Sequence, residues 1–403
     1  FRMNMNEIAT NIASMSIYVI PSQVENKEIL ANKLASVLNV NQLSIYNKIN
    51  KKTSIVKIFP EGKNISNDLA KQISSWKEKG VYLVYDNQRY YPYNELLAHS
   101  IGFVGIDNQG LTGLENKYDS MLKGSKGYLN YKLDAKGGLL DGYSSEIISP
   151  INGFNIQLTI DLKIQQIIER ELKNAYEKYS PESIYAIAMN PNNGEILGIS
   201  SYPSFDLNNY SSYNQEIYNR NLPVWKSYEP GSTFKMVVAA AALEEEVITQ
   251  SEYVYDRGIY PYGHNPVCWY YTEYKRGHGN INVQSALQKS CNYFFYEMGR
   301  RLGVDTIAKY AEYFGLAQDT GIELTGESIG SIASTAEAEK RGDTWYSSNV
   351  LSAAIGQSYN NYTPIQMARY VSMIANGGNY INCTLIKEIK DIDGNRIPKD
   401  EIN

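Results

Sequence analysis

A serine and a lysine three positions apart are the residues of this chain best placed for covalent chemistry. Ser232 and Lys235 follow a Pro-Gly turn and open an apolar, alanine-rich run over 236–243. If an α-helix starts at Ser232, the hydroxyl and the amine lie on one face, beside the unpaired N–H groups and positive potential of a helix start. That potential disfavours an ammonium ion, so a neutral Lys235 can take the proton of Ser232. The pattern predicts a covalent serine acyltransferase.

The Ser-x-x-Lys spacing alone is common in this chain. It recurs at Ser54, Ser74 and Ser120, and a serine before a helix is usually only an N-cap. Two features distinguish Ser232: the sharp Pro-Gly entry and the long apolar run behind it, which the other copies lack. Because a motif needs its structural context, the prediction depends on that helix.

A second polar triplet, Ser290-Cys291-Asn292, follows a helical stretch at 283–289 and precedes an aromatic run. A second hydroxyl can relay a proton between nucleophile, lysine and leaving amine. An asparagine amide offers a donor and an acceptor to a substrate amide. The alternative is that Ser290 only caps a helix or occupies a turn. Since each motif adjoins a helix and supplies chemistry that the other needs, we predict that Ser290 and Asn292 act with Ser232.

Potential metal ligands lie close together in the sequence: Cys268, His278 and Cys291, with Asp256 and His264 nearby. Zinc binds Cys, His and carboxylate side chains in a tetrahedron, although this spacing is not that of a zinc finger. Two alternatives remain open. The cysteines are buried free thiols, or Cys268 and Cys291 form a disulfide outside the cytoplasm.

The elements that must position these residues mix α and β throughout. The N-terminal third predicts strands at 17–20, 53–60 and 81–85, a helix at 26–40 and a turn at 134–142. Beyond 150–153, the sequence predicts a strand at 154–161, a helix at 162–178, a hairpin of strands at 184–189 and 195–200, and a helix at 364–375 behind a capping box. His99 is expected to be structural and Cys383 a lone half-buried thiol. We predict two domains, residues 1–150 and 151–403.

Composition limits the class of protein. A chain of 403 residues has room for two or three domains, and 43% hydrophobic with 20% charged residues is typical of a globular protein. A net charge of −5 gives no reason to expect nucleic acid. The longest clean apolar run, 236–243, is far shorter than the ~20 residues of a membrane-spanning helix, and no signal peptide is recognisable.

At this point the chain resembles a known family, the class B penicillin-binding proteins. The stretches 228–235 (YEPGSTFK) and 290–299 (SCNYFFYEMG) look like its first two catalytic motifs. Residues 153–161, 186–203, 320–327 and 355–368 are similar to further parts of its transpeptidase domain, and 99–105 and 110–127 to its non-catalytic pedestal. The resemblance implies an α+β or α/β multidomain fold: a mixed pedestal or dimerisation domain, then an antiparallel sheet flanked by helices.

The resemblance also implies an activity, peptidoglycan D,D-transpeptidation. Ser232 would be the acylated nucleophile and Lys235 its base, while Ser290 would relay protons and Asn292 would anchor the substrate amide. The substrates would be peptidoglycan stem peptides, and β-lactam antibiotics would acylate the same serine. No cofactor is expected for catalysis. We expect a groove past Trp225, Tyr228 and a loop at 269–271.

One departure from the family concerns its third motif, Lys-Thr/Ser-Gly on an edge strand of the sheet. Thr325-Gly326 has no lysine before it, and no other copy is found before Asn403. That strand normally supplies half of the oxyanion hole, and losing one such donor costs on the order of 10²–10³ in rate. We expect the motif to lie after Asn403; without it, the chain as written would be crippled or inactive.

Further expectations rest on the resemblance alone. Some members carry a structural zinc, and the matching ligands here would be Asp256, Cys268, His278 and Cys291, with His264 as substitute if Asp256 is too far. The first residues resemble sequence that follows a membrane anchor. We therefore expect an extracytoplasmic domain of a single-span protein, its anchor absent here, with a glycosyltransferase partner. The composition leans towards sporulation-type proteins of endospore-forming bacteria.

Two other functions compete with transpeptidation. A serine β-lactamase or β-lactam sensor shares the Ser-x-x-Lys pattern but lacks a pedestal like residues 1–150. A non-catalytic scaffold for division or sporulation proteins would fit the missing third motif. The sequence does not decide between elongation, division and spore cortex, nor does it give the oligomeric state.

Overall fold

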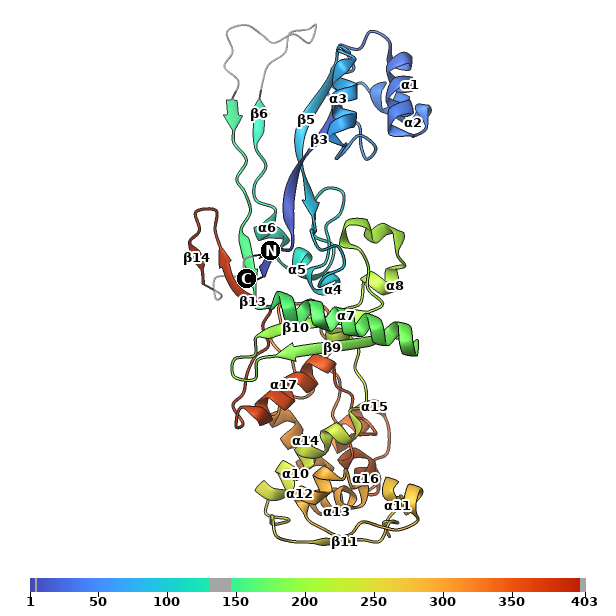
Figure 1. Ribbon diagram of the computed structural model, residues 1–403, viewed down its shortest axis with the longest axis vertical. Coiled ribbons are helices and arrows are strands. Elements are labelled where there is room, and N and C mark those ends of the chain that lie inside the picture. The colour runs from blue at the N-terminus through green and yellow to red at the C-terminus, as the bar shows by residue number, and fades with distance from the viewer. Residues whose placement is uncertain (4–5, 131–145, 399–403) are drawn as a thin grey trace.

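The computed structural model describes residues 1–3, 6–130 and 146–398, which form an elongated molecule. Figure 1 shows a sheet-and-helix head at one end, a neck of short elements beside the N-terminus, and a helical body at the other end. The architecture is mixed helix and sheet, as the sequence predicted. The turn predicted at 134–142 lies outside the described residues.

The head is a three-stranded antiparallel sheet packed against three helices. Its strands lie in the order β4-β3-β5, and its elements are β3 (Thr10–Val19), α1 (Lys27–Leu38), α2 (Gln42–Ile49), β4 (Val56–Lys57), α3 (Asn67–Ser75) and β5 (Val81–Tyr90). Asn26, Asn41 and Ser66 cap the three helices. The strand predicted at 53–60 was too long: β4 is only Val56–Lys57, since the residues before it are exposed and a turn begins at residue 59.

The neck joins the two ends of the chain. It contains α4 (Ala98–Ile101), α5 (Gly113–Lys117), α6 (Asp119–Leu122) and the hairpin of β6 (Tyr128–Asn130) and β7 (Glu146–Ile148). A five-stranded sheet lies beside them in the order β14-β13-β8-β1-β2, from β1 (Arg2–Met3), β2 (Asn6–Glu7), β8 (Asn155–Leu158), β13 (Ile386–Lys390) and β14 (Arg396–Ile397). Phe103, Ile156 and Ile386 belong to one buried cluster, so residues on both sides of the boundary predicted near 150 share a core.

A two-stranded sheet separates the neck from the body. Strands β9 (Ile184–Met189) and β10 (Ile196–Tyr202) are antiparallel, as predicted, and α7 (Leu162–Tyr179) packs across them. On the body side lies α17 (Pro364–Ala375), which packs against β9. The capping box that opens α17 is present as predicted, between Thr363 and Gln366. His99 Nδ1 lies 3.4 Å from Ser201 Oγ on β10 and its Nε2 lies 2.8 Å from the Ile217 carbonyl, and burial lowers the pKa of its imidazole to about 4.

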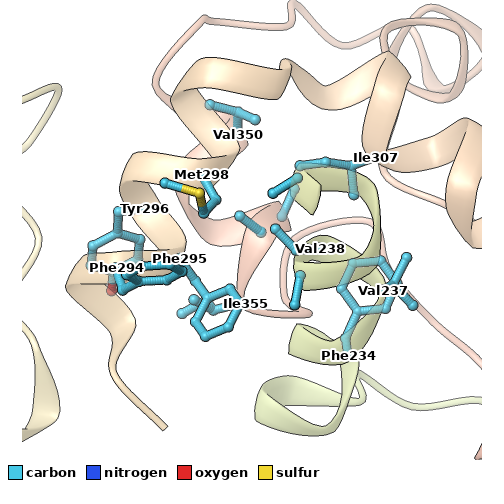
Figure 2. Packing of buried hydrophobic residues seen from close by; sticks show 14 of the residues in the cluster. Phe234, Val237, Val238, Phe294, Phe295, Tyr296, Met298, Ile307, Val350 and Ile355 are labelled. Carbon is cyan, nitrogen blue, oxygen red and sulfur yellow. The ribbon is translucent and has the colours of Figure 1, made fainter. Parts of the chain in front are cut away.

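The body is helical and carries every residue predicted to do chemistry. Its elements are α9 (Leu222–Trp225), the 3₁₀ helix η2 (Gly231–Phe234), α10 (Lys235–Glu244), β11 (Val254–Asp256), α11 (Trp269–Tyr274), β12 (Gly279–Ile281), α12 (Val283–Gln288), α13 (Asn292–Leu302), α14 (Val304–Tyr313), α15 (Thr335–Arg341) and α16 (Asn349–Ala354). The 3₁₀ helix η1 (Leu207–Ser212) and α8 (Gln215–Tyr218) precede them in the chain and pack with Phe103 on the neck side of the sheet. Figure 2 shows side chains of α10, α13 and α16 converging on one core, among them Val238, Met298 and Val350. This core holds the first motif against the second.

Three sequence predictions for the body need correction. The α-helix begins at Lys235, not at Ser232, because Gly231–Phe234 form a 3₁₀ turn. Residues 269–271, predicted as a loop, open α11, which ends where Lys275 adopts a left-handed conformation. Cys383 is fully buried, not half-buried, and burial raises the pKa of its thiol to about 12.

Candidate active site

The turn that carries Ser232 is exposed and is closed by its own backbone. The Lys235 N–H donates to the Ser232 carbonyl, and Thr233 Oγ1 donates to the Pro230 carbonyl over 2.7 Å. The Ser232 side chain itself is exposed. Within the described residues its hydroxyl makes no hydrogen bond, so it is open to an incoming molecule.

Gly356 and Tyr370, from much later in the chain, hold this turn in place by hydrogen bonds. Gly231 N–H donates to the Gly356 carbonyl over 2.9 Å, and the buried Tyr370 hydroxyl donates to the Thr233 carbonyl over 3.0 Å. Gly356 has a positive φ of 77°, and a Cβ there would lie 2.2 Å from the Gly231 carbonyl oxygen. Only glycine allows the two backbone segments to approach this closely, so Gly356 determines the position of the turn that carries Ser232.

Lys235 is buried beneath the turn and points at the second motif. Its Nζ donates to the Ser290 carbonyl over 3.0 Å, to Ser290 Oγ over 3.0 Å and to Asn292 Oδ1 over 2.6 Å. The same Nζ lies 5.5 Å from the centroid of the Phe295 ring. Burial lowers the pKa of Lys235 to about 8, because desolvation penalises the charged ammonium. A fraction of these amines is therefore neutral near physiological pH and can accept a proton.

Ser290 owes its position to the end of α12. Its N–H donates to the Leu287 carbonyl and the Cys291 N–H donates to the Ala286 carbonyl, the bonding pattern of a Schellman motif. The residue at this point normally is glycine, since φ is positive, yet Ser290 has φ of 49°. The left-handed conformation costs a non-glycine residue about 1–2 kcal/mol. This left-handed conformation directs both the carbonyl and the hydroxyl of Ser290 towards Lys235.

The predicted active-site residues thus come together, with one difference. Lys235, Ser290 and Asn292 form one hydrogen-bonded group, and Ser232 sits one 3₁₀ turn before Lys235. No hydrogen bond between Ser232 Oγ and Lys235 Nζ is present in the described structure. All three protons of a Lys235 ammonium are engaged, so a proton must leave Nζ before the amine can act as a base.

The predicted metal ligands also form one cluster, next to the second motif. One donor atom each of Asp256, Cys268, His278 and Cys291 lies within 4.8 Å of the others. His278 Nδ1 is 2.7 Å from Asp256 Oδ2 and 3.8 Å from Cys268 Sγ. Cys291 Sγ is 3.4 Å from the same carboxylate oxygen. His264, the predicted substitute, is exposed and outside the cluster.

The donor set fits a tetrahedral metal ion. Zinc bond lengths of about 2.0–2.3 Å imply ligand spacings of roughly 3.3–3.8 Å; the Cys291–Asp256 and Cys268–His278 spacings, 3.4 and 3.8 Å, lie in this range, while His278 and Asp256 are closer, at 2.7 Å. The three cysteines are free, which removes the disulfide alternative for Cys268 and Cys291 in this structure. A hydrogen bond with Cys291 lowers the pKa of the Cys268 thiol, which favours the thiolate that a metal binds. His278 turns Nδ1 towards Asp256 and Cys268, while its buried Nε2 has no hydrogen-bond partner among the described residues.

The sequence missed the residues that hold these groups in place. Gly356, Tyr370 and Trp269 fix the turn of Ser232 and the carbonyl of Ser290, but Trp269 was predicted only as a groove wall. The signal for Gly356 was a glycine inside a family-like stretch. Tyr370 gave no signal, since a tyrosine on an amphipathic helix looks like ordinary packing.

Two family models match the chain. "Penicillin binding protein transpeptidase domain" matches residues 184–403 and "Penicillin-binding Protein dimerisation domain" matches residues 3–158. These ranges cover both the helical body and the head with its neck. Every candidate catalytic residue and metal ligand lies inside the first range.

Named relatives agree with these models. The chain is 44% identical to "Stage V sporulation protein D" of Bacillus subtilis (strain 168), over 95% of this chain and 58% of that protein. It is 27% identical to "Peptidoglycan D,D-transpeptidase MrdA" of Escherichia coli (strain K12), over 92% of this chain and 63% of that protein. The chain therefore spans about three-fifths of the length of these relatives. Its fold matches a penicillin-binding protein (PBP2) solved in complex with MreC from Helicobacter pylori, with a TM-score of 0.79 and 26% identity over 96% of this chain and 77% of that one.

Proposed function

The chain belongs to the class B penicillin-binding proteins, and on that premise we propose that it is a peptidoglycan D,D-transpeptidase. The observation that carries the proposal is the buried Lys235, which is bonded to both polar side chains of the second motif and follows Ser232 by one turn. An enzyme that cross-links stem peptides needs a serine nucleophile and a base that is neutral near physiological pH.

The proposed reaction has two acyl transfers. Ser232 Oγ attacks the penultimate D-Ala carbonyl of a stem peptide while the Lys235 amine takes the hydroxyl proton. The C–N bond then breaks, the proton passes to the leaving D-Ala amine, and an ester forms on Ser232. An amine of a neighbouring stem peptide attacks that ester, and its proton returns to Ser232 Oγ. Ser290 Oγ, 3.0 Å from Lys235 Nζ, is placed to relay these protons.

Asn292 would hold the substrate through one half of its amide. Its Oδ1 accepts from Lys235 over 2.6 Å, so the amide nitrogen is the group left to donate to a peptide carbonyl. The sequence predicted that both halves of the amide would face the substrate. The structure supports a donor role only, which makes Asn292 also a partner of the base.

Benzylpenicillin tests this proposal, because its strained amide acylates the same nucleophile. We expect mass spectrometry of the full-length protein, with whatever follows Asn403, to show one covalent adduct that Ser232→Ala abolishes. A long-lived adduct separates a transpeptidase from a β-lactamase, which would release hydrolysed penicillin quickly. If no adduct forms at all, the non-catalytic scaffold becomes the better explanation of this protein.

We propose zinc as the occupant of the Asp256, Cys268, His278 and Cys291 cluster. Four protein ligands leave no open position, so the ion would be structural and would stabilise the segment that carries Ser290. Elemental analysis after purification, with and without a chelator, tests it. We expect one zinc per protein, lost in Cys268→Ser together with thermal stability; full stability of a zinc-free protein would end the idea.

We also propose an extracytoplasmic protein anchored by a segment outside these residues and assembled with a glycosyltransferase. In the described residues no helix has the length and hydropathy to cross a membrane. The relative named for stage V of sporulation supports a role in spore formation, and the PBP2–MreC complex is a precedent for assembly with other proteins. Membrane fractionation of sporulating cells tests the location; recovery of the full-length protein in the cytoplasm would contradict it.

A further inference from the structure

One backbone carbonyl in the candidate active site has two donors. The Ser290 oxygen accepts from Lys235 Nζ over 3.0 Å and from Trp269 Nε1 over 3.0 Å. The same indole N–H lies 3.2 Å from the Lys289 carbonyl. Trp269 is the first residue of α11 and directly follows Cys268. Its indole therefore joins the segment beside the metal-ligand cluster to the second motif.

The shared carbonyl matters because Lys235 cannot lose a proton without also losing a hydrogen bond. Its Nζ faces three acceptors: the Ser290 carbonyl, Ser290 Oγ and Asn292 Oδ1. A neutral amine has only two protons and must turn its lone pair towards Ser232, so at least one acceptor must be released. A buried acceptor left without a donor costs about 1–3 kcal/mol. That cost would add to the barrier of acylation.

The three acceptors differ in what happens when Lys235 leaves them. Ser290 Oγ is the proposed proton relay and Asn292 Oδ1 makes the shortest of the three bonds. Among the described residues, the Ser290 carbonyl is the one of these three acceptors that has a second donor from another side chain, Trp269. It is therefore the acceptor that Lys235 can release without leaving an unpaired polar atom. The left-handed Ser290 backbone, with φ of 49°, would also lose a restraint if both donors were absent.

We propose that Trp269 is a positioning residue, which keeps the Ser290 carbonyl hydrogen-bonded while Lys235 turns away to take the proton of Ser232. The proposal rests on the proposed acyl-enzyme chemistry. Trp269 touches neither substrate nor the reacting atoms. It acts through the Ser290 carbonyl, and its indole N–H is the only part of the side chain that the role requires.

The kinetic test removes that N–H. In Trp269→Phe, we expect the rate constant of Ser232 acylation by benzylpenicillin to fall roughly tenfold, the scale of one lost hydrogen bond, with the non-covalent dissociation constant of penicillin unchanged. The matched control is Trp76→Phe, since Trp76 follows α3 in the head and lies outside the candidate active site. If Trp269→Phe does not fold, its benzothienyl-alanine replacement keeps the ring shape and still lacks the N–H. Acylation within twofold of wild type in either variant overturns the proposal.

A second measurement does not depend on acylation. Trp269→Phe should change the unfolding equilibrium constant little in the wild-type background, because Lys235 still bonds the Ser290 carbonyl. In a Lys235→Met background the carbonyl loses both donors, and we expect the same change to raise that constant roughly tenfold more. Additive effects in urea melts would show that the two donors do not share the carbonyl, and would overturn the proposal. If wild type is never acylated, the proposed function and the catalytic role of Trp269 fall together, and this cycle alone decides whether the carbonyl is shared.

Discussion

Two places in the helical body each bury a cation, and they use it differently. Lys235 is 1% exposed and Arg369, on α17, is 0% exposed. Neither has a carboxylate within ion-pair distance in the part of the chain that the structure describes. Arg369 donates to three carbonyls and one hydroxyl, those of Gly315, Gln318, Asp319 and Tyr380. Both sites thus surround a buried charge with neutral oxygens.

The difference lies in what each cation can do with its proton. A guanidinium keeps its charge under all ordinary conditions and fits several carbonyls with its fixed fork. Arg369 therefore ties the loop after α14 to α17 permanently. An ammonium responds to burial, and the pKa of Lys235 falls to about 8. In the same kind of environment, arginine acts as a structural brace, a cation that stays charged and holds two segments together, whereas lysine acts as a base.

The largest effect should come from removing the base. Lys235→Met is expected to lower acylation of Ser232 about 10³-fold, within the range for losing a general base. Stability should change little, because removal of a desolvated charge offsets the donors lost to Ser290 Oγ and Asn292 Oδ1, and Trp269 still bonds the Ser290 carbonyl. Penicillin adduct formation and thermal melting measure the two quantities. A strongly destabilised Lys235→Met protein would contradict the comparison.

Removing the brace should do the reverse. Arg369→Met leaves several buried oxygens without a donor, so we expect a loss of about 3 kcal/mol in the free energy of unfolding. Acylation of the remaining folded protein should stay within a few-fold of wild type. Arg170→Met is the control, since that arginine is exposed on α7. Equal stabilities for the two variants would show that Arg369 is not a brace.

The partly buried acid Glu169 adds a third case to the comparison, because the free-energy cost of burying its carboxylate depends on pH. Glu169 Oε1 accepts from Leu97 N–H and Gln165 Nε2, and burial raises the pKa of its carboxyl to about 7. The native state then binds more protons than the unfolded state between about pH 4.5 and 7, so stability falls as pH rises through that window. Glu169→Gln mimics the protonated acid and should stabilise by roughly 1–3 kcal/mol at pH 8, with little change at pH 4.

Melting curves at both pH values check this, with Glu171→Gln as the exposed control on the same helix. A stabilisation that is equal at pH 4 and pH 8 would mean that ionisation of Glu169 is not its cause.

The pH profile of acylation depends on the same amine. Because the neutral form of Lys235 is the base and its pKa is about 8, the acylation rate should rise about tenfold per pH unit below pH 8 and level off above it. Stopped-flow labelling with a fluorescent penicillin gives this profile. A rate that is flat from pH 6 to 9 would assign the base to another group.

Local patterns in the sequence were enough for the elements with clear start and stop signals. The helix at 364–375 and the strand at 184–189 were predicted to the residue, because a capping box and a Pro-Asn-Asn-Gly turn define them. The short strand at 56–57 and helix α11 were not, since their lengths depend on contacts rather than on periodicity. The 3₁₀ turn at Ser232 was missed because its shape is set by Gly356, far away in the sequence.

The candidate site likewise contains residues that sequence patterns could identify and residues that they could not. Ser232, Lys235, Ser290 and Asn292 could be named because their types and spacing carry chemistry. The roles of Arg369 and Trp269 could not, since their acceptors are backbone carbonyls at distant positions. A backbone carbonyl is the same in every residue, so no pattern of side chains reveals which one will be bonded.

The contact between Gly231 and Gly356 has a consequence for the order of assembly. A nascent chain that has emerged only as far as α13 already contains the serine, the lysine and the second motif, yet it lacks the glycine on which the serine's turn rests. The nucleophile can therefore take its final shape only late in synthesis, once the rest of the body is available to fold around it. An unfinished chain would hold Ser232, Lys235, Ser290 and Asn292 and still lack the backbone contact that shapes the turn of the serine.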